Sequence, residues 1–125
     1  YVNIDYKEIL SVVAIVEKGR NERIIAEARY AYDARSEAYE VAFIVDEAFQ
    51  GKGIAFFMFD YLVKIARDRG IRWFIAYVLP RNEAMLKVFE RSNLEISRSF
   101  EAGALVFRFD LTGRTDAARP RAETV

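Results

Sequence analysis

Short apolar runs separated by polar turns fill the first third of the chain and predict β-strands. Residues 9–17 are apolar and mostly β-branched, which is typical of a strand. Residues 18–22 have the glycine and polar residues of a hairpin turn, and the chain returns as a second strand over 23–32. After a polar turn, a third strand is expected at 38–46. Because the links are short, the three strands should form an antiparallel meander.

The hydrophobic period then changes to that of a helix over residues 52–69, with Gly70 at the position that ends it. A strand rich in aromatic and β-branched residues follows at 71–79, and it should lie parallel to strand 38–46 because a helix joins the two. The side of the helix away from the core is expected to carry Asp60, Lys64, Arg67 and Asp68. Its buried face is expected to consist of Ile54, Met58, Tyr61, Leu62, Ile65 and Ala66.

The last third of the chain predicts a second helix and a hairpin. Asn82 is a suitable N-cap for a helix through about Ser92, and strands at 94–100 and 105–111 flank a turn. The order βββ-α-β-α-ββ indicates a mixed α/β (α+β) fold with a largely antiparallel sheet. One domain is therefore expected over residues 1–111, followed by a polar tail at 112–125 that we expect to be disordered.

Composition narrows the chemistry. Nineteen basic and nineteen acidic residues cancel, so no overall field attracts nucleic acid or an anionic membrane. The absence of cysteine excludes a thiolate nucleophile and cysteine-bound zinc, and the absence of histidine removes the usual general base. With no apolar run long enough to span a membrane and no signal peptide at its start, the sequence predicts a cytoplasmic protein without a metal site.

The stretch from Glu40 to Ala55 carries the strongest functional signal. An apolar strand leads through an acidic turn into Gly51 and Gly53, which open the first helix. Amides in the first turn of a helix lack intrahelical partners, and glycines let an anion approach the backbone. A Walker A loop is excluded because its Gly-x-x-x-x-Gly-Lys-Ser/Thr pattern is missing, and a dinucleotide fingerprint is disfavoured by Phe56. The two glycines alone would also suit a turn that binds nothing.

The segment Gln50-Gly-Lys-Gly-Ile-Ala55 resembles the (Gln/Arg)-x-x-Gly-x-(Gly/Ala) signature of the GNAT superfamily of N-acetyltransferases. In that family the loop holds the pyrophosphate of acetyl-CoA, and the preceding strand splays from its parallel neighbour to admit the pantetheine arm. By this resemblance, the backbone contacts to pantetheine fall on Phe43, Ile44 and Val45. The pyrophosphate contacts fall on Gln50, Gly51, Lys52, Gly53, Ile54, Ala55 and Phe56. Lys52 could equally be a solvated lysine at the start of the helix.

The second helix resembles another part of the GNAT pattern, an Asn followed after seven residues by Tyr and then by Gly-Phe. Asn82 matches, and the resemblance implies a contact near pantetheine beside its role as N-cap. Phe89 stands where many members carry the tyrosine that protonates the departing CoA thiolate, and a phenyl ring cannot donate a proton. Asn93-Leu94 replaces Gly-Phe, which is compatible because Asn tolerates a left-handed helix end.

Glu40 is the candidate general base. An acceptor lysine ammonium has a pKa of about 10.4 and must lose a proton before its nitrogen attacks a thioester. Glu40 lies ten residues before Gln50, where GNAT protein-lysine acetyltransferases carry a glutamate base. A solvated carboxylate at the strand edge is the alternative. Without cysteine, direct transfer in a ternary complex is favoured over an acyl-enzyme.

The resemblance is strongest to protein-lysine acetyltransferases whose GNAT domain is attached to an acyl-CoA synthetase-like or nucleotide-binding region. It implies acetyl-CoA as acyl donor and a primary amine, such as a protein lysine, as acceptor. The usual N-terminal strand and two helices of a GNAT domain are missing, so we expect a homo-oligomer or an upstream segment to complete the fold. Two alternatives stay open: a regulatory module that binds acyl-CoA without turnover, and a structural or oligomerisation fragment.

Overall fold

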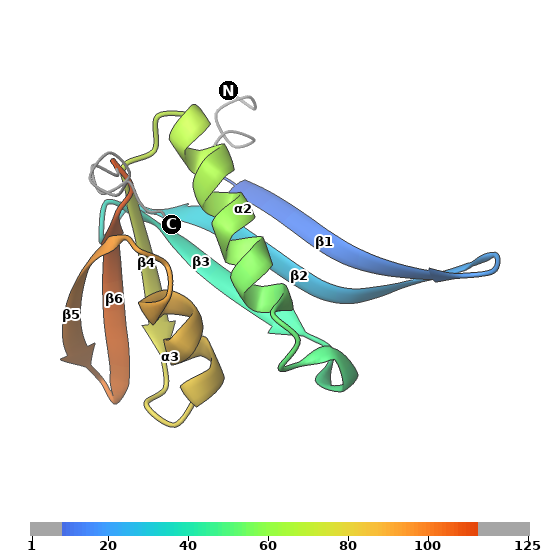
Figure 1. The fold of residues 1–125 in the computed structure, drawn as a ribbon. Helices are drawn as coiled ribbons and strands as arrows, with labels where there is room; N and C mark the ends of the chain where they lie inside the picture. The colour runs from blue at the N-terminus through green and yellow to red at the C-terminus, as the bar shows by residue number, and fades with distance from the viewer. Residues whose placement is uncertain (1–8, 113–125) are drawn as a thin grey trace.

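The computed structural model describes residues 9–112, which form one six-stranded sheet with two helices (Figure 1). The expected tail therefore lies outside the described residues, apart from Thr112. Along the chain the elements are β1 (Ile9–Lys18), β2 (Asn21–Asp33), β3 (Ala38–Val45), a 3-10 turn η1 (Glu47–Phe49), α2 (Ile54–Asp68), β4 (Trp73–Val78), α3 (Glu83–Glu90), β5 (Glu95–Glu101) and β6 (Ala104–Asp110).

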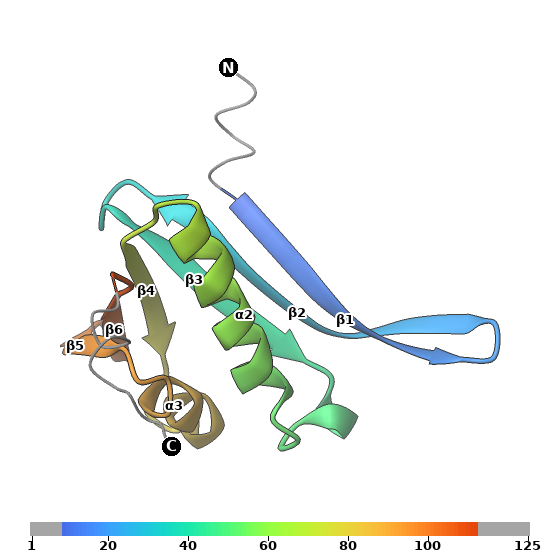
Figure 2. The same ribbon diagram turned by 45° about the horizontal axis from the view of Figure 1, so that its top comes forward.

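The strand order in the sheet is β1-β2-β3-β4-β6-β5, and all neighbours are antiparallel except β3 and β4. The expected meander, the parallel pair and the final hairpin are thus confirmed. The last strand, β6, lies between β4 and β5, so the hairpin folds back against β4. The β1–β2 hairpin extends beyond the helices at its turn (Figures 1 and 2).

The parallel pair β3–β4 is the weak point of the sheet. Its register contains two pairs, Tyr39 with Phe74 and Glu40 with Ile75. Beyond Glu40, β3 continues to Val45 in pairing with β2, without a β4 partner. The two strands therefore separate after Glu40, as the resemblance implied.

Both helices cover the same face of the sheet, with α2 lying along β2 and β3 and α3 near β4 and β6 (Figure 1). An aromatic cluster joins helices and sheet on this face. The rings of Phe59 in α2 and Phe89 in α3 lie 5.1 Å apart, and both lie within 5.2 Å of the Phe109 ring on β6. Phe43 on β3 reaches the same cluster. We refer to this side as the covered face.

The opposite side of the sheet, the open face, has no helix over it within residues 9–112. A small buried group of Ala38, Ile75 and Val106 lies here, with Trp73 against it. The Trp73 ring is flanked by the guanidinium groups of Arg72 and Arg108, at 4.7 and 4.6 Å from its centroid. On the open face, cation–π contacts to Trp73 thus add to the burial of a small apolar group.

The buried stripe of α2 differs from the expected one. Tyr61, expected in the core, is 48% exposed and stacks on Phe57 instead. Ile54 and Ile65 are half-buried, and Arg67 turns inward to donate from Nε to the Leu111 carbonyl. The buried stripe is rotated about the helix axis, away from Tyr61 and towards Phe59 and Val63, because α2 packs against both the sheet and Phe89. Its buried residues are Met58, Phe59, Leu62, Val63 and Ala66.

Both helix ends follow local chemistry. α2 ends before Gly70, whose φ of +81° is the left-handed conformation that glycine adopts freely. α3 is followed by Asn93 with a φ of +64°, as expected from asparagine's tolerance of this region. α2 is shorter than predicted by two residues at its start and one at its end, and α3 is shorter by two residues at its end, while its start agrees with the prediction.

Candidate functional site

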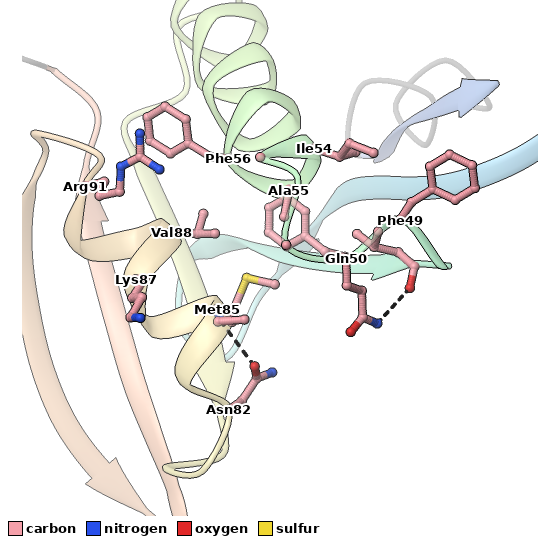
Figure 3. A pocket seen from close by; sticks show the side chains of 15 residues that line it. Phe49, Gln50, Ile54, Ala55, Phe56, Asn82, Met85, Lys87, Val88 and Arg91 are labelled. Atoms are coloured by element: carbon pink, nitrogen blue, oxygen red, sulfur yellow. Dashed lines mark hydrogen bonds between the residues drawn. The ribbon is translucent and has the colours of Figure 1, made fainter. Parts of the chain in front are cut away.

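The loop between β3 and α2 is tied to the end of β3 and to β2 by hydrogen bonds. Asp46 caps the turn η1 by accepting from the Ala48 N–H at 2.9 Å, and it pairs with Arg23 on β2. Gln50 Nε2 donates to the Val45 carbonyl at 3.0 Å, which ties the loop back to the end of β3 (Figure 3). Gly51 and Gly53 have φ values of +79° and +84°. These contacts hold the loop in a backbone conformation with positive φ, which residues other than glycine rarely adopt.

Gly53 is the N-cap of α2, and the first backbone bond of the helix runs from Phe57 N–H to the Gly53 carbonyl. The amides of Ile54, Ala55 and Phe56 precede that bond and have no carbonyl within the helix to donate to. Together with the helix dipole, they make the loop suited to bind an anion.

A cavity of about 500 Å³ opens where the loop, the end of β3 and α3 meet (Figure 3). Nine of the eleven residues predicted to bind the cofactor line it. They are Phe43, Val45, Gln50, Gly51, Gly53, Ile54, Ala55, Phe56 and Asn82. The structure thus brings together residues from three separate elements at the point where β3 and β4 diverge.

Two predicted contacts lie apart from this cavity. The Ile44 side chain projects from the open face and is 70% exposed, but the predicted contact there uses the backbone and stays a prediction. Lys52 lines a neighbouring groove between β1 and α2, together with Val12 and Tyr61. Its role beside the loop also stays a prediction.

The helix α3 adds residues that sequence reasoning missed. Lys87 and Arg91, one turn apart, both line the cavity, as do Met85 and Val88. The Arg91 guanidinium lies 4.4 Å from the centre of the Phe56 ring, above the first turn of α2 (Figure 3). Two cations beside a set of free amides make this cavity favourable for a phosphorylated ligand. The i, i+4 spacing of Lys87 and Arg91 was the available signal.

Asn82 occupies the start of α3 as predicted. Its side-chain oxygen accepts from the Met85 N–H at 3.2 Å, so it caps the helix while it lines the cavity.

Glu40 lies on the other side of the sheet, in a groove of about 640 Å³ on the open face. The Arg108 guanidinium donates to the Ser36 carbonyl at 2.9 Å, which ties the turn after β2 to β6 and closes one side of this groove. Charged and hydroxyl side chains dominate its walls. They include Asp33, Arg35, Glu40, Tyr77, Glu101 and Arg108.

Glu40 is exposed at the last position where β3 still pairs with β4. It therefore stands where the cleft between the strands begins. The loop cavity lies on the covered side of this cleft and the groove on the open side. A long ligand anchored at the loop could reach Glu40 through the gap between the strands.

The groove also raises the pKa of the Tyr77 phenol above its usual value of 10.0. Burial is the main cause, and the nearby carboxylates of Asp33, Glu40 and Glu101 add to it, while Arg35 acts in the opposite direction. The three carboxylates at this groove are suited to a cationic ligand.

With this geometry in place, the comparison with protein families is decisive. Residues 4–93, which are more than half of the chain, match the model of the acetyltransferase (GNAT) family. The chain belongs to the GNAT family. Members of this family use acetyl-CoA as acyl donor.

Relatives in the family support the same assignment. The acetyltransferase Pat of Mycolicibacterium smegmatis is 34% identical over 89 residues, which cover 70% of this chain and 26% of that protein. The crystal structure of the GNAT domain of PAT from S. lividans superposes with a TM-score of 0.71 at 35% identity, over 85% of this chain and 62% of that one. The chain thus spans about a quarter of the curated relative and under two thirds of the solved domain.

A more distant structure shows the fold alone. The PaiA N-acetyltransferase of Thermoplasma acidophilum, solved in complex with coenzyme A, is 14% identical, with a TM-score of 0.67 over 82% of this chain and 61% of that one. The mixed, mostly antiparallel sheet with two helices is therefore the GNAT fold.

Phe89, which replaces the tyrosine of the GNAT pattern, is buried in the aromatic cluster. Its ring is 1% exposed and packs among Phe43, Phe59 and Phe109. It is an element of the core and has no group that could donate a proton.

Two further observations concern the described part of the chain. Among residues 9–112, no cluster of three or more potential metal-binding side chains was found. No helix within that range is long and apolar enough to cross a membrane.

Proposed function

We propose that this chain binds acetyl-CoA and transfers the acetyl group directly to a primary amine, with a protein lysine as the acceptor. The observation that carries the proposal is the separation of β3 and β4 after Glu40, with the loop cavity on one side and the groove on the other. Such a gap lets a thioester held from one face meet an amine that arrives from the other.

The donor side would use mainly backbone. The amides of residues 51–56 and the N-terminal dipole of α2 suit a pyrophosphate, with Lys87 and Arg91 nearby as cations. Beyond Glu40, β3 lacks a β4 partner, so backbone groups of Phe43, Ile44 and Val45 are suited to pair with the amide groups of pantetheine.

The acceptor side would use Glu40. Its carboxylate takes a proton from the lysine ammonium, directly or through water, and the free amine then attacks the thioester carbonyl carbon. The C–S bond breaks as the amide forms, and CoA leaves. Because the chain contains no cysteine, an acyl-cysteine intermediate has no place in this reaction. The carboxylates of Asp33, Glu40 and Glu101 at the groove support a cationic acceptor.

A second candidate function, a regulatory module that binds acyl-CoA without turnover, is favoured by Phe89, which replaces the usual proton donor. Release of CoA in the presence of a lysine peptide separates the two functions. Binding of acetyl-CoA without release would support the regulatory module.

The donor site is tested by calorimetry with CoA on the Gly53→Val variant. A Cβ at Gly53 meets no protein atom within 4 Å, so the valine would project into the space that a phosphate needs. We expect CoA binding to weaken at least about 100-fold, which corresponds to about 2.8 kcal/mol.

Gly103→Val is the matched control, because Gly103 has nearly the same φ of +83° and an equally open surrounding, at the β5–β6 turn. It carries the same backbone strain away from the loop, and its CoA affinity should equal that of the wild type. Equal CoA binding by folded Gly53→Val protein would show that the pyrophosphate lies elsewhere.

A further inference from the structure

Loss of the usual proton donor at Phe89 leaves a chemical step without an assigned group. When the C–S bond of a thioester breaks, the sulfur leaves with negative charge, and a proton donor nearby lowers the barrier. The Phe89 ring is packed into the aromatic cluster and cannot serve.

Tyr77 lies where such a donor is needed. Ile75 pairs with Glu40 and is the last β4 residue in register with β3. Tyr77 comes two positions after Ile75, so the side chains of Tyr77 and Ile75 project to the same face of the sheet. Glu40, Ile75 and Tyr77 line one groove. Tyr77 thus belongs to the part of β4 that has already separated from β3, beside the gap through which a thioester would reach Glu40.

The other tyrosines of residues 9–112 are placed differently. The Tyr30 hydroxyl is buried on the covered face and accepts from Arg69 at 3.3 Å. Tyr32 and Tyr39 pack against each other there, with ring centroids 5.1 Å apart. Tyr61 lies on α2 beside the groove that faces β1. Among these five, Tyr77 is the one that lines the groove of Glu40.

The charges around Tyr77 suit a group that must stay protonated. Asp33 at the end of β2, Glu40 on β3 and Glu101 on β5 line the groove as acidic residues, and Arg35 and Arg108 line it as basic ones. Arg98 also lines it, but its guanidinium lies over the Phe107 ring and pairs with Glu90 on the covered face. Burial and the carboxylates raise the pKa of the Tyr77 phenol. The phenol is therefore protonated at neutral pH, which is the form that a proton donor needs.

We propose that Tyr77 donates its hydroxyl proton to the CoA sulfur as the thioester C–S bond breaks. This inference rests on the proposed transferase function. The nitrogen that attacked the thioester still carries an extra proton at that stage, and the tyrosinate takes it as the amide forms. The proton that Glu40 removed from the ammonium passes to water, so Tyr77 and Glu40 both return to their starting states.

The test is single-turnover acetyl transfer from bound acetyl-CoA to a lysine peptide. Tyr77→Phe should lower the transfer rate about 100-fold or more, with CoA affinity in calorimetry unchanged within about threefold. Tyr61→Phe is the matched control, since Tyr61 and Tyr77 are 48% and 44% exposed and Tyr61 lies outside the groove. Its rate should equal that of the wild type.

A second measurement separates proton donation from a structural role. A fluorinated tyrosine at position 77 has a more acidic phenol, so the rate should fall at a lower pH than in the wild type. The same replacement at position 61 should leave the pH profile unchanged. If the Tyr77 hydroxyl had only a structural role, the pH at which the rate falls would not change with the acidity of the phenol.

The outcomes separate the two proposals. If the wild type transfers acetyl and Tyr77→Phe transfers at the same rate, Tyr77 is not the donor and the transferase function stands. An unshifted pH profile with fluorotyrosine at position 77 would also overturn the inference. If the wild type binds CoA but transfers nothing to any amine, the transferase function fails and the role of Tyr77 fails with it.

Discussion

The two faces of the sheet are built on different principles. The covered face is packed by aromatic rings between α2, α3 and the strands, and the loop cavity at its edge relies on backbone amides. The open face carries charged side chains around Glu40 and Tyr77, with Trp73 held between two arginines. The covered face therefore supplies rigidity and a general anion site, while the open face supplies the ionisable groups that chemistry needs.

This difference predicts where substitutions act. A change on the covered face should reduce the free energy of unfolding, because interior packing is dense and cavities are costly. A change on the open face should alter reaction rate and pH dependence with little loss of stability. Each of the following predictions tests that division.

The largest effect is expected at Phe59, which is fully buried at the centre of the aromatic cluster. Its ring contacts Phe43, Phe74, Phe89 and Phe109. Phe59→Ala should lower the free energy of unfolding by about 3–5 kcal/mol in a denaturant titration. Ile44→Ala, on the open face, should change it by less than about 0.5 kcal/mol. Similar losses for the two variants would contradict the division between the faces.

The next largest effect is expected at Glu40. Glu40→Gln keeps the size and hydrogen-bonding capacity of the side chain but removes its basicity. The rate of acetyl transfer near neutral pH should fall by about 100-fold or more, with CoA affinity and melting temperature nearly unchanged.

The loss at Glu40 should shrink at high pH, where free amine becomes abundant without a base. Glu47→Gln, which makes the same change in the turn η1 outside the groove, is the control and should keep the wild-type rate. A Glu40→Gln rate equal to that of the wild type across the pH range would leave Glu40 as a structural residue.

Much of the fold follows from local sequence signals. The strands were predicted within about two residues because β-branched runs and polar turns alternate clearly, and Gly70 and Asn93 marked the helix ends. The meander, the parallel pair and the final hairpin were predicted, but the pairing of β6 with β4 was not. Placement of β6 between β4 and β5 depends on contacts between segments far apart in the chain, which local patterns do not encode.

The same contrast applies to the site. The glycine loop was recognisable because its residues are contiguous and its task depends on backbone conformation. Five different strands contribute residues to the groove, so no single stretch of sequence predicts it. These residues are Asp33, Glu40, Tyr77, Glu101 and Arg108. Tyr61 was assigned to the core on periodicity alone, and packing of α2 against sheet and α3 turned it outward.

Asn82 offers a smaller, two-part test on the covered face. Asn82→Ala removes the acceptor for the Met85 N–H and should lower the free energy of unfolding by about 1 kcal/mol. Asn82→Ser restores a cap and should recover most of that stability. If Asn82 also contacts the pantetheine arm, both variants should weaken CoA binding in calorimetry. Full recovery of CoA affinity in Asn82→Ser would show that Asn82 acts as a cap alone.

The smallest effect is expected at Asp110, on the open face at the end of β6. Arg72 hydrogen-bonds this carboxylate, and Thr112 donates to it from its backbone N–H at 3.0 Å. These contacts, with that of Arg72 the largest, lower the pKa of Asp110 from 3.8 to about 2, against a smaller opposing effect of burial. Because the pKa is lower in the folded state, the stabilisation is complete above about pH 4 and is lost as the pH falls towards 2.

Asp110→Asn should therefore lower the melting temperature slightly near neutral pH, by an amount equivalent to less than about 1 kcal/mol, since Arg72 is largely exposed. The difference from the wild type should diminish between pH 4 and pH 2 in thermal melts. Asp60→Asn makes the same change in an exposed i, i+4 pair with Lys64, and its effect should be no more than about 0.5 kcal/mol. If the Asp110→Asn deficit persisted unchanged at pH 2, the Arg72 and Thr112 contacts would not be the source of the stability, and the open face would depend on packing, like the covered one.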